Sequence, residues 1–275
     1  MTIWLTVILV TSFVIAYFPV WRTLVLTWYG SEQYSHGFLV VPIFIYILLT
    51  KKDKLSETPV QPSLWGLGLV ILSSLLYLFA HFAEIVTVSS CSIVLLLIGI
   101  VVYLYGARML KELAFPLFFL LFMIPIPSQI YATLTIPLQL FVSKASAWLA
   151  MLWGVPLYRE GNIIHLPDRS MQIVQACSGL RSMASLLALS VLLAYFMLRS
   201  NLLRVALFLS GIPTAIIVNI VRVLLLVVVF HYCNLDLTAR ALHTVFGLFI
   251  FLLALLIMIA IRGILSHWDK RTIET

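Results

Sequence analysis

Charged residues and cysteines are scarce in this chain, and each scarcity excludes whole classes of protein. Only 10% of the 275 residues are charged, whereas a soluble domain carries roughly 25%. So few charges cannot cover a globular surface, and a hydrophobic share of 63% excludes an intrinsically disordered chain. The mean hydropathy of +1.14 indicates a polytopic membrane protein, and apolar stretches of helix-spanning length make it all-α.

The cysteine content argues against metal centres and disulfide scaffolds. The chain has three cysteines, Cys91, Cys177 and Cys233, which form no CxxC pair and cannot all pair with one another. The segment HYCNLD offers His231 and Asp236 beside Cys233, but no fourth ligand lies near. HExxH and GxSG motifs are missing as well, which argues against a zinc protease and a serine rhomboid. We expect no metal and no cofactor.

Basic residues outnumber acidic ones by 17 to 10, which gives a net charge of +7. In a soluble protein this excess would suggest nucleic-acid binding. In a membrane protein it marks cytoplasmic connections, so we expect membrane lipids and not nucleic acid around these residues.

About eight stretches are long and apolar enough to be transmembrane helices, because a helix needs about 20 apolar residues to cross the hydrocarbon. The fifth is short and contains Pro116. The expected spans are 3–21, 36–50, 64–82, 85–105, 113–126, 183–198, 203–230 and 244–262.

The orientation follows from four short basic segments, which hold ten of the 17 basic residues: 51–63, 106–112, 199–204 and 262–271. Placing all four in the cytoplasm puts both termini inside. It also requires that 130–153 does not cross the membrane.

Segment 130–153 carries a polar stripe, in which Gln139, Ser143 and Ser146 recur at four- and three-residue steps beside Lys144. Apolar residues cover the rest, as in an amphipathic helix that lies in the interface or re-enters the membrane. The alternative is a ninth span in which Lys144 faces a polar interior.

The longest polar interruption is 154–181. Its Gly, Pro and Asn positions separate short runs at 162–166 and 171–174, which predicts a small β-hairpin-like cap. Under the orientation above this cap is extracytoplasmic. We therefore expect a single integral membrane domain, 1–275, with a cap region at about 130–181.

Cys177 and Ser178 stand where the sixth span begins, with Arg181 one turn further on. Free N–H groups and the positive end of the helix dipole lower the pKa of a thiol there, which makes Cys177 a candidate nucleophile. Two alternatives stay open: simple packing of a small residue, and a disulfide with Cys233.

Two further spans contribute polar groups at the same predicted surface. Asn219 and Arg222 lie three residues apart on one helical face, and an arginine in so apolar a stretch is a functional candidate unless it snorkels to the interface. His243 begins the last span, where a lone histidine is often only solvated. Together, Cys177, Arg222 and His243 would supply a nucleophile, an oxyanion stabiliser and a proton carrier for acyl transfer.

Three motifs, QACSGLRS, NIVR and HTVFG, resemble those of the exosortase/archaeosortase family, as do the earlier YSHGFLV and IPIP. The resemblance runs from Tyr34 to about Gly247. It implies a membrane-embedded cysteine transpeptidase in which Cys177 is the nucleophile and Arg222 and His243 are catalytic. The resemblance also suggests a supporting role for His36, and the alternative is that His36 belongs to an ordinary belt of interfacial residues. Arg181, Ser178 and Asn219 are candidates for substrate binding or support.

The resemblance also implies the partners and the location. Substrates would be exported proteins ending in a short motif, a hydrophobic helix and a basic tail (PEP-CTERM-like), with an envelope glycan or lipid as the acceptor of any transfer. The chain would lie in a bacterial inner membrane with its active site on the extracytoplasmic side. The alternative from another class is a polytopic transporter or an envelope polysaccharide assembly factor without thiol catalysis.

Overall fold

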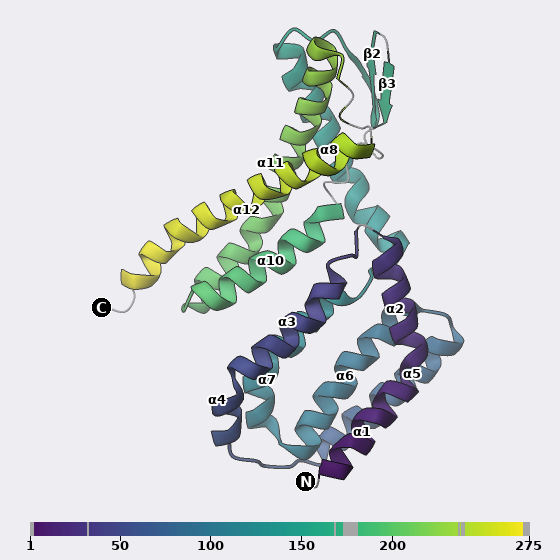
Figure 1. Ribbon diagram of the computed structural model, residues 1–275, viewed down its shortest axis with the longest axis vertical. Helices are drawn as coiled ribbons and strands as arrows, with labels where there is room; N and C mark the ends of the chain where they lie inside the picture. The colour runs from purple at the N-terminus through teal and green to yellow at the C-terminus, as the bar shows by residue number, and fades with distance from the viewer. Residues whose placement is uncertain are drawn as a thin grey trace. The chain divides into compact units, whose positions relative to one another are not determined.

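The computed structural model describes residues 3–31, 33–167, 169–172, 181–235, 237 and 240–271. The chain divides into two compact units, Met1–Pro127 and Ser128–Thr275, which are described one at a time (Figure 1). The boundary falls close to the start of the expected cap region. The single domain 1–275 stays a prediction.

The first unit is helical. Its elements are α1 (Ile3–Ala16), α2 (Phe18–Gly30), α3 (Gly37–Thr50), α4 (Lys52–Glu57), α5 (Trp65–Phe82), α6 (Val86–Leu104), α7 (Ala107–Phe119) and the 3₁₀ helix η1 (Leu120–Met123). The expected span 3–21 is broken at Tyr17, because Pro19 stands in the first turn of α2 and has no N–H to continue the preceding helix. The expected span 113–126 ends as a helix before Ile124, where the IPIP turn begins.

The second unit combines four helices with a small sheet. These are α8 (Ser128–Leu152), β1 (Tyr158–Glu160), β2 (Ile163–Leu166), β3 (Arg169–Gln172), α10 (Arg181–Met197), α11 (Asn201–Cys233) and α12 (Arg240–Arg271). The strands form an antiparallel sheet in the order β1-β2-β3, with Glu160 opposite Ile163 and Ile164 opposite Met171. Gly161, at a φ of +57°, makes the tight turn between β1 and β2. The expected hairpin-like cap is therefore present, with a third strand added.

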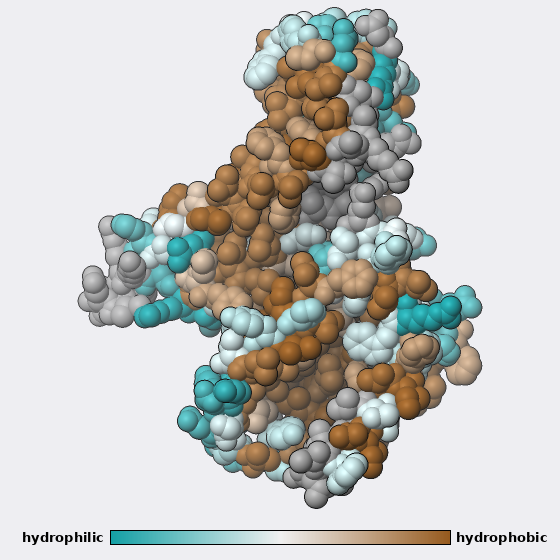
Figure 2. Space-filling model, viewed as in Figure 1, coloured by the Kyte–Doolittle hydropathy of each residue, from teal (hydrophilic) through white to brown (hydrophobic). Residues whose placement is uncertain are grey.

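Five helices in the described part of the chain are long and apolar enough to cross a membrane. They are α5, α6, α8, α11 and residues Val245–Asp269 of α12, and two shorter apolar helices lie at Gly37–Thr50 and Met183–Met197. Large apolar side chains are exposed on these helices. They cover much of the visible helical surface, whereas hydrophilic side chains gather toward helix ends and the sheet (Figure 2). The protein is thus built for lipid contact, and the count of eight spans stays a prediction.

The interfacial placement of α8 stays a prediction, but the structure changes the interpretation of its polar stripe. The segment expected to lie in the interface is one continuous 25-residue helix that meets the length and hydropathy of a span. Ser143 and Ser146 of its polar stripe are fully buried, while Phe141, Lys144 and Trp148 are on the exposed side. The stripe faces protein instead of water, so it is no evidence for an interfacial helix. Lys144 likewise does not face a polar interior.

Helices α5 and α6 pack through glycines. A Cβ on Gly66 would overlap the backbone of Tyr103, and one on Gly99 would lie 2.9 Å from the backbone N of Val70. Glycine therefore allows the two backbones to approach more closely than any side chain would permit, the usual device of helix pairs in membranes.

Two of the sequence motifs meet in the first unit, at the end of η1. Pro125 and Pro127 have no N–H and cannot continue the helix, so carbonyls at the end of η1 and in the IPIP turn need other partners. Four side chains donate to these carbonyls: Trp28 Nε1 to Met123 O at 2.9 Å, His36 Nε2 to Phe122 O at 3.0 Å, the Tyr34 hydroxyl to Ile126 O at 3.3 Å and the Thr87 hydroxyl to Pro125 O at 2.7 Å. YSHGFLV and IPIP thus form one hydrogen-bonded unit, in which His36 braces the turn.

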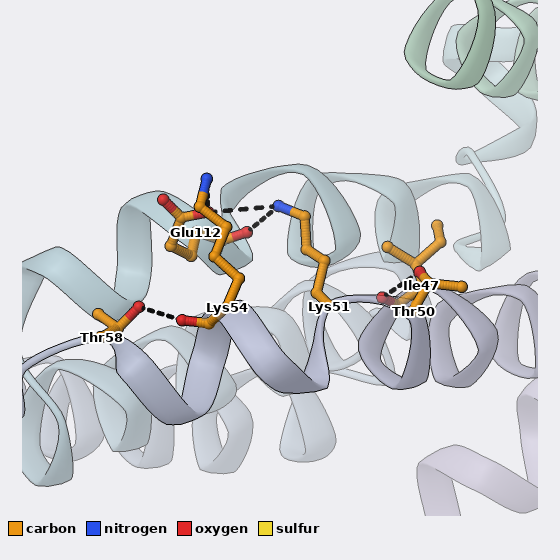
Figure 3. Close-up of polar contacts among 6 residues, drawn as sticks. All are labelled: Ile47, Thr50, Lys51, Lys54, Thr58 and Glu112. Carbon is orange, nitrogen blue, oxygen red and sulfur yellow. Dashed lines mark hydrogen bonds and ion pairs between the residues drawn. The ribbon is translucent and has the colours of Figure 1, made fainter.

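An ion cluster joins α3 and α4 to α7 (Figure 3). Lys51 Nζ donates to the backbone O of Glu112 at 2.7 Å, and Lys54 Nζ lies 2.9 Å from its carboxylate. The hydrogen bond from Lys54 is the main cause that holds the pKa of Glu112 below its usual value. Two lysines that indicate orientation in the sequence therefore also bind one helix to another.

We expect Gly66→Ala to destabilise the protein. The added methyl group must displace the Tyr103 backbone, which costs about 1–3 kcal/mol, as overpacking does in a filled interior. Thermal unfolding of the detergent-purified protein measures the loss. Gly68→Ala is the matched control, since no atom lies within 4 Å of its added Cβ; equal unfolding temperatures for the two variants would contradict the packing argument.

Glu112→Gln should lower stability slightly at pH 7, by about 0.2–1 kcal/mol as for an exposed ion pair. The folded-state pKa lies below the ordinary 4.5, so the unfolded state binds the proton more readily. The stabilisation is complete above about pH 4.5 and is lost as the pH falls through the folded-state pKa.

Unfolding temperatures of the wild type and Glu112→Gln should therefore converge on acidification. Glu57→Gln on neighbouring α4 is the control, because the described residues show no ion pair for Glu57. A difference between wild type and Glu112→Gln that persists at acidic pH would count against the ion cluster.

Candidate functional site

Helix α11 organises the second unit, because both apolar clusters of that unit pack on it. With 33 residues it is about 50 Å long. Leu207, Ala215 and Val218 of its first part pack with residues of α10 and α12. Val223, Leu226 and Val227 of its second part pack with α8 and the sheet. Asn219 and Arg222 stand between the last buried residue of one cluster and the first of the other.

Arg222 and Asn219 are both inside the protein, with exposed fractions of 3% and 1%. Snorkelling of Arg222 to an interface, the alternative raised by the sequence, does not fit this burial. A guanidinium keeps its proton in proteins, so Arg222 places a permanent positive charge within the unit. The predicted juxtaposition of the two residues on one helical face is confirmed.

Helix α8 contacts α11 at the same place. Ser146 Oγ donates to Ile220 O at 3.2 Å, within the NIVR segment, and Ser143 Oγ donates to Gly161 O at 3.1 Å in the turn of the sheet. Ala147 and Ala150 continue this buried face. The spacing of small residues at 143, 146, 147 and 150 is the signal for close helix packing that the interpretation as a polar stripe missed.

Helix α10 starts level with Asn219. A Cβ on Gly211 of α11 would lie 3.1 Å from Leu187 Cδ2 and 3.4 Å from Ser190 Oγ, so the antiparallel helices are close there. Arg181 lies six residues before Leu187 and nine before Ser190. Because the two helices are antiparallel, the start of α10 at Arg181 is level with the residues six and nine positions after Gly211, which are residues 217 and 220. The chain that carries Cys177 thus enters α10 beside the NIVR segment.

Helix α12 brings His243 toward the same level. Ser210 Oγ of α11 lies 4.0 Å from Met258 Sδ of α12. Twelve residues forward along α11 lead to Arg222, and twelve residues back along the antiparallel α12 lead to Phe246, so these two residues are at the same level. Phe246 packs against both apolar clusters. His243 is one turn before it, in the first turn of a helix that begins at Arg240 and not at the expected 244.

The three-stranded sheet lies at this end of the unit. Ile164, Leu166 and Met171 bury one of its faces against α8 and the second part of α11. Arg169, the first residue of β3, places its guanidinium over the ring of Phe230, 5.4 Å from the centroid. Tyr232 donates its hydroxyl to Trp153 O at 2.7 Å and ties the ends of α11 and α8 together. The sheet is therefore anchored to the helix that holds Arg222.

Part of the predicted site is outside the described residues. Cys177 and Ser178 fall in 173–180, and for Arg181 and His243 the structure gives the helix but not the side chain. His36 belongs to the first unit, where it braces the IPIP turn. What the structure brings together is the start of α10, the NIVR segment and the first turns of α12.

Two of the three cysteines lie in the described part of the chain, and neither is in α10. Cys233 is the exposed last residue of α11 and has no disulfide partner among the described residues, while Cys91 is half-buried in α6. The described ranges contain no group of His, Cys, Asp and Glu side chains suited to a metal ion. Site chemistry must therefore be argued from Arg222, Asn219 and the helix starts beside them.

Comparison with known proteins adds one match. The family model of transmembrane exosortases matches residues 6–260, which is most of the chain and includes all three predicted motifs. No curated protein and no solved structure matches. The family model agrees with the apolar helices above in requiring an integral membrane protein, and the chain belongs to the transmembrane exosortase family.

Proposed function

We propose that this exosortase is a membrane-embedded cysteine transpeptidase that cleaves the C-terminal sorting signal of exported proteins. The observation that carries the proposal is the burial of Arg222 at the level where α10 and α12 begin. A permanent cation inside an apolar unit is costly and marks a functional site, and a guanidinium there can stabilise negative charge that develops during a reaction. The chain with Cys177 joins β3 to α10, five residues after Gln172 and four before Arg181, and His243 lies in the first turn of α12.

The mechanism follows from these three groups. His243 accepts the thiol proton of Cys177, and the thiolate attacks the scissile carbonyl carbon. Arg222 stabilises the negative charge that develops on the carbonyl oxygen. When the C–N bond breaks, His243 gives its proton to the leaving amine, and the substrate remains as a thioester on Cys177.

Resolution of the thioester decides the product. An amine or hydroxyl of an envelope acceptor, activated by loss of its proton to His243, attacks the thioester and regenerates the thiol of Cys177. A glycan or lipid acceptor gives transfer, and water gives hydrolysis. No cofactor and no metal enters these steps.

The proposed setting is a bacterial inner membrane with the reaction on its extracytoplasmic side. The sheet, the ends of α8 and α11 and the starts of α10 and α12 lie at one end of the second unit. Arg199 and Arg204 flank the α10–α11 turn at the other end, which the positive-inside rule assigns to the cytoplasm. A substrate helix alongside these helices would have its cleavage motif near Arg222 and its basic tail in the cytoplasm.

Removal of the thiol is the first test. Cys177→Ala should leave the precursor uncut while the protein still accumulates in membranes, because no other group replaces the nucleophile. The substrate is a reporter fused to the C-terminal signal of a protein encoded beside this one. Immunoblots of precursor and product measure cleavage.

Cys91→Ala and Cys233→Ala are matched controls that should cut the reporter at the wild-type rate. In a Cys233→Ala background, an impermeant thiol reagent should label Cys177 from the extracytoplasmic side. Normal processing by Cys177→Ala would overturn the proposal and favour a transporter or a polysaccharide assembly factor.

Arg222→Lys should lower the cleavage rate about 100- to 1000-fold, as expected for the loss of an oxyanion-stabilising donor, because a flexible ammonium does not reproduce the planar guanidinium. The measurement is the rate of reporter cleavage at equal amounts of membrane protein. Arg204→Lys, at the other end of α11, changes a guanidinium that donates to Leu198 O and should cut normally. An undiminished rate in Arg222→Lys would remove Arg222 from the mechanism.

A further inference from the structure

The Asn219 amide is unusual among the buried polar side chains described in the second unit, because both of its polar atoms lack a hydrogen-bond partner. Ser143, Ser146, Ser190 and Thr214 are buried too, and each donates a hydrogen bond to a backbone carbonyl. The Asn219 side chain is 1% exposed, yet neither its Nδ2 nor its Oδ1 has a hydrogen-bond partner in the described part of the chain. Its amide thus combines full burial with unused donors and acceptors.

A buried amide without hydrogen-bond partners does not stabilise the folded chain. A buried donor or acceptor without a partner loses its hydrogen bonds to water and gains none in return. Leucine has the same branching and the same number of side-chain heavy atoms as asparagine, and its apolar side chain would suit the neighbouring apolar clusters. A group that costs stability where it stands calls for a role outside the folded chain.

The position of Asn219 indicates that role. It lies one turn before Arg222 on the same helical face, level with the start of α10, and follows Val218, a member of the apolar cluster against which Phe246 of α12 packs. Ser146 of α8 holds the carbonyl of the next residue, Ile220. The amide is therefore held by rigid helices beside the guanidinium assigned to the scissile carbonyl.

We propose that Asn219 binds the backbone of the substrate's extended cleavage segment, with Nδ2 donating to a substrate carbonyl and Oδ1 accepting from a substrate N–H. A carboxamide matches a peptide unit because each offers one donor side and one acceptor side. An anionic headgroup would use only the donor and would be served by Arg222. This assignment rests on the proposed function, and it makes Asn219 a substrate-binding residue that is not consumed in the chemistry.

The test compares Asn219→Leu with Thr214→Val, a near-isosteric change on the same helix that removes a satisfied hydroxyl. Asn219→Leu should unfold at the same temperature as the wild type or higher, yet cleave the reporter with kcat/KM lowered about 10- to 100-fold, mainly through KM. Thr214→Val should lose some thermal stability and cleave normally. Asn219→Ala should resemble Asn219→Leu in cleavage.

Binding is measured separately in the Cys177→Ala protein, which holds substrate without cutting it. The probe is a fluorescent synthetic peptide with the same C-terminal signal as the reporter. Adding Asn219→Leu should weaken its Kd by a similar factor. An unchanged Kd would overturn the proposal, as would a lowered unfolding temperature or failed membrane accumulation of both Asn219 variants, because the amide would then be structural.

The outcomes separate this inference from the function on which it rests. If Cys177→Ala is inactive and Asn219→Leu cleaves at the wild-type rate, only the role of Asn219 fails. If Cys177→Ala cleaves normally, the transpeptidase function fails, whatever Asn219→Leu does. Competition of peptide binding by inorganic phosphate that disappears in Asn219→Leu would assign Asn219 to an anion and overturn its role in binding peptide.

Discussion

Burial of polar groups inside apolar surroundings is the constraint on which the second unit depends. Most of its buried hydroxyls donate to carbonyls, so their burial costs little, and those of Ser143 and Ser146 also tie α8 to the sheet turn and to α11. Arg222 and Asn219 are different, because one brings a permanent charge and the other an amide without partners among the described residues. An unsatisfied buried group costs about 1–3 kcal/mol. The two apolar clusters on α11 supply the stability that makes this cost tolerable.

In the first unit the polar groups that need partners are backbone carbonyls. The end of η1 and the IPIP turn cannot satisfy their carbonyls through a continuing helix, and four side chains from distant parts of the sequence donate to them instead. His36 and Tyr34 therefore have a structural role as hydrogen-bond donors to these carbonyls, which a resemblance in sequence does not reveal. A motif shared by a family marks constraint, and the contacts decide whether that constraint is catalytic or architectural.

Several expectations depended only on the pattern of residues along the sequence, and these were confirmed because short strands and long apolar helices are encoded locally. Turn residues at 161–162 and short β-branched runs predicted the hairpin, and long apolar runs predicted α5, α6 and α11. The Ser143 and Ser146 stripe was misread because periodicity gives the face of a helix but not what covers it. In a soluble protein a polar stripe faces water. In this protein the exposed face of α8 is mostly apolar, and the small polar residues are buried against α11 and the sheet turn.

Composition by itself determined the membrane class, the resemblance of three motifs indicated the family, and the placement of polar residues at the ends of spans singled out Cys177, Arg222 and His243 as candidate groups. Only the tertiary structure decided that α8 packs on the NIVR segment, that Arg222 is buried and not at an interface, and that Asn219 keeps its amide unpaired within the described residues. The physical reason is that hydropathy records the preference of each residue for lipid or water. Burial and hydrogen bonding between helices depend on neighbours that are far away in the sequence.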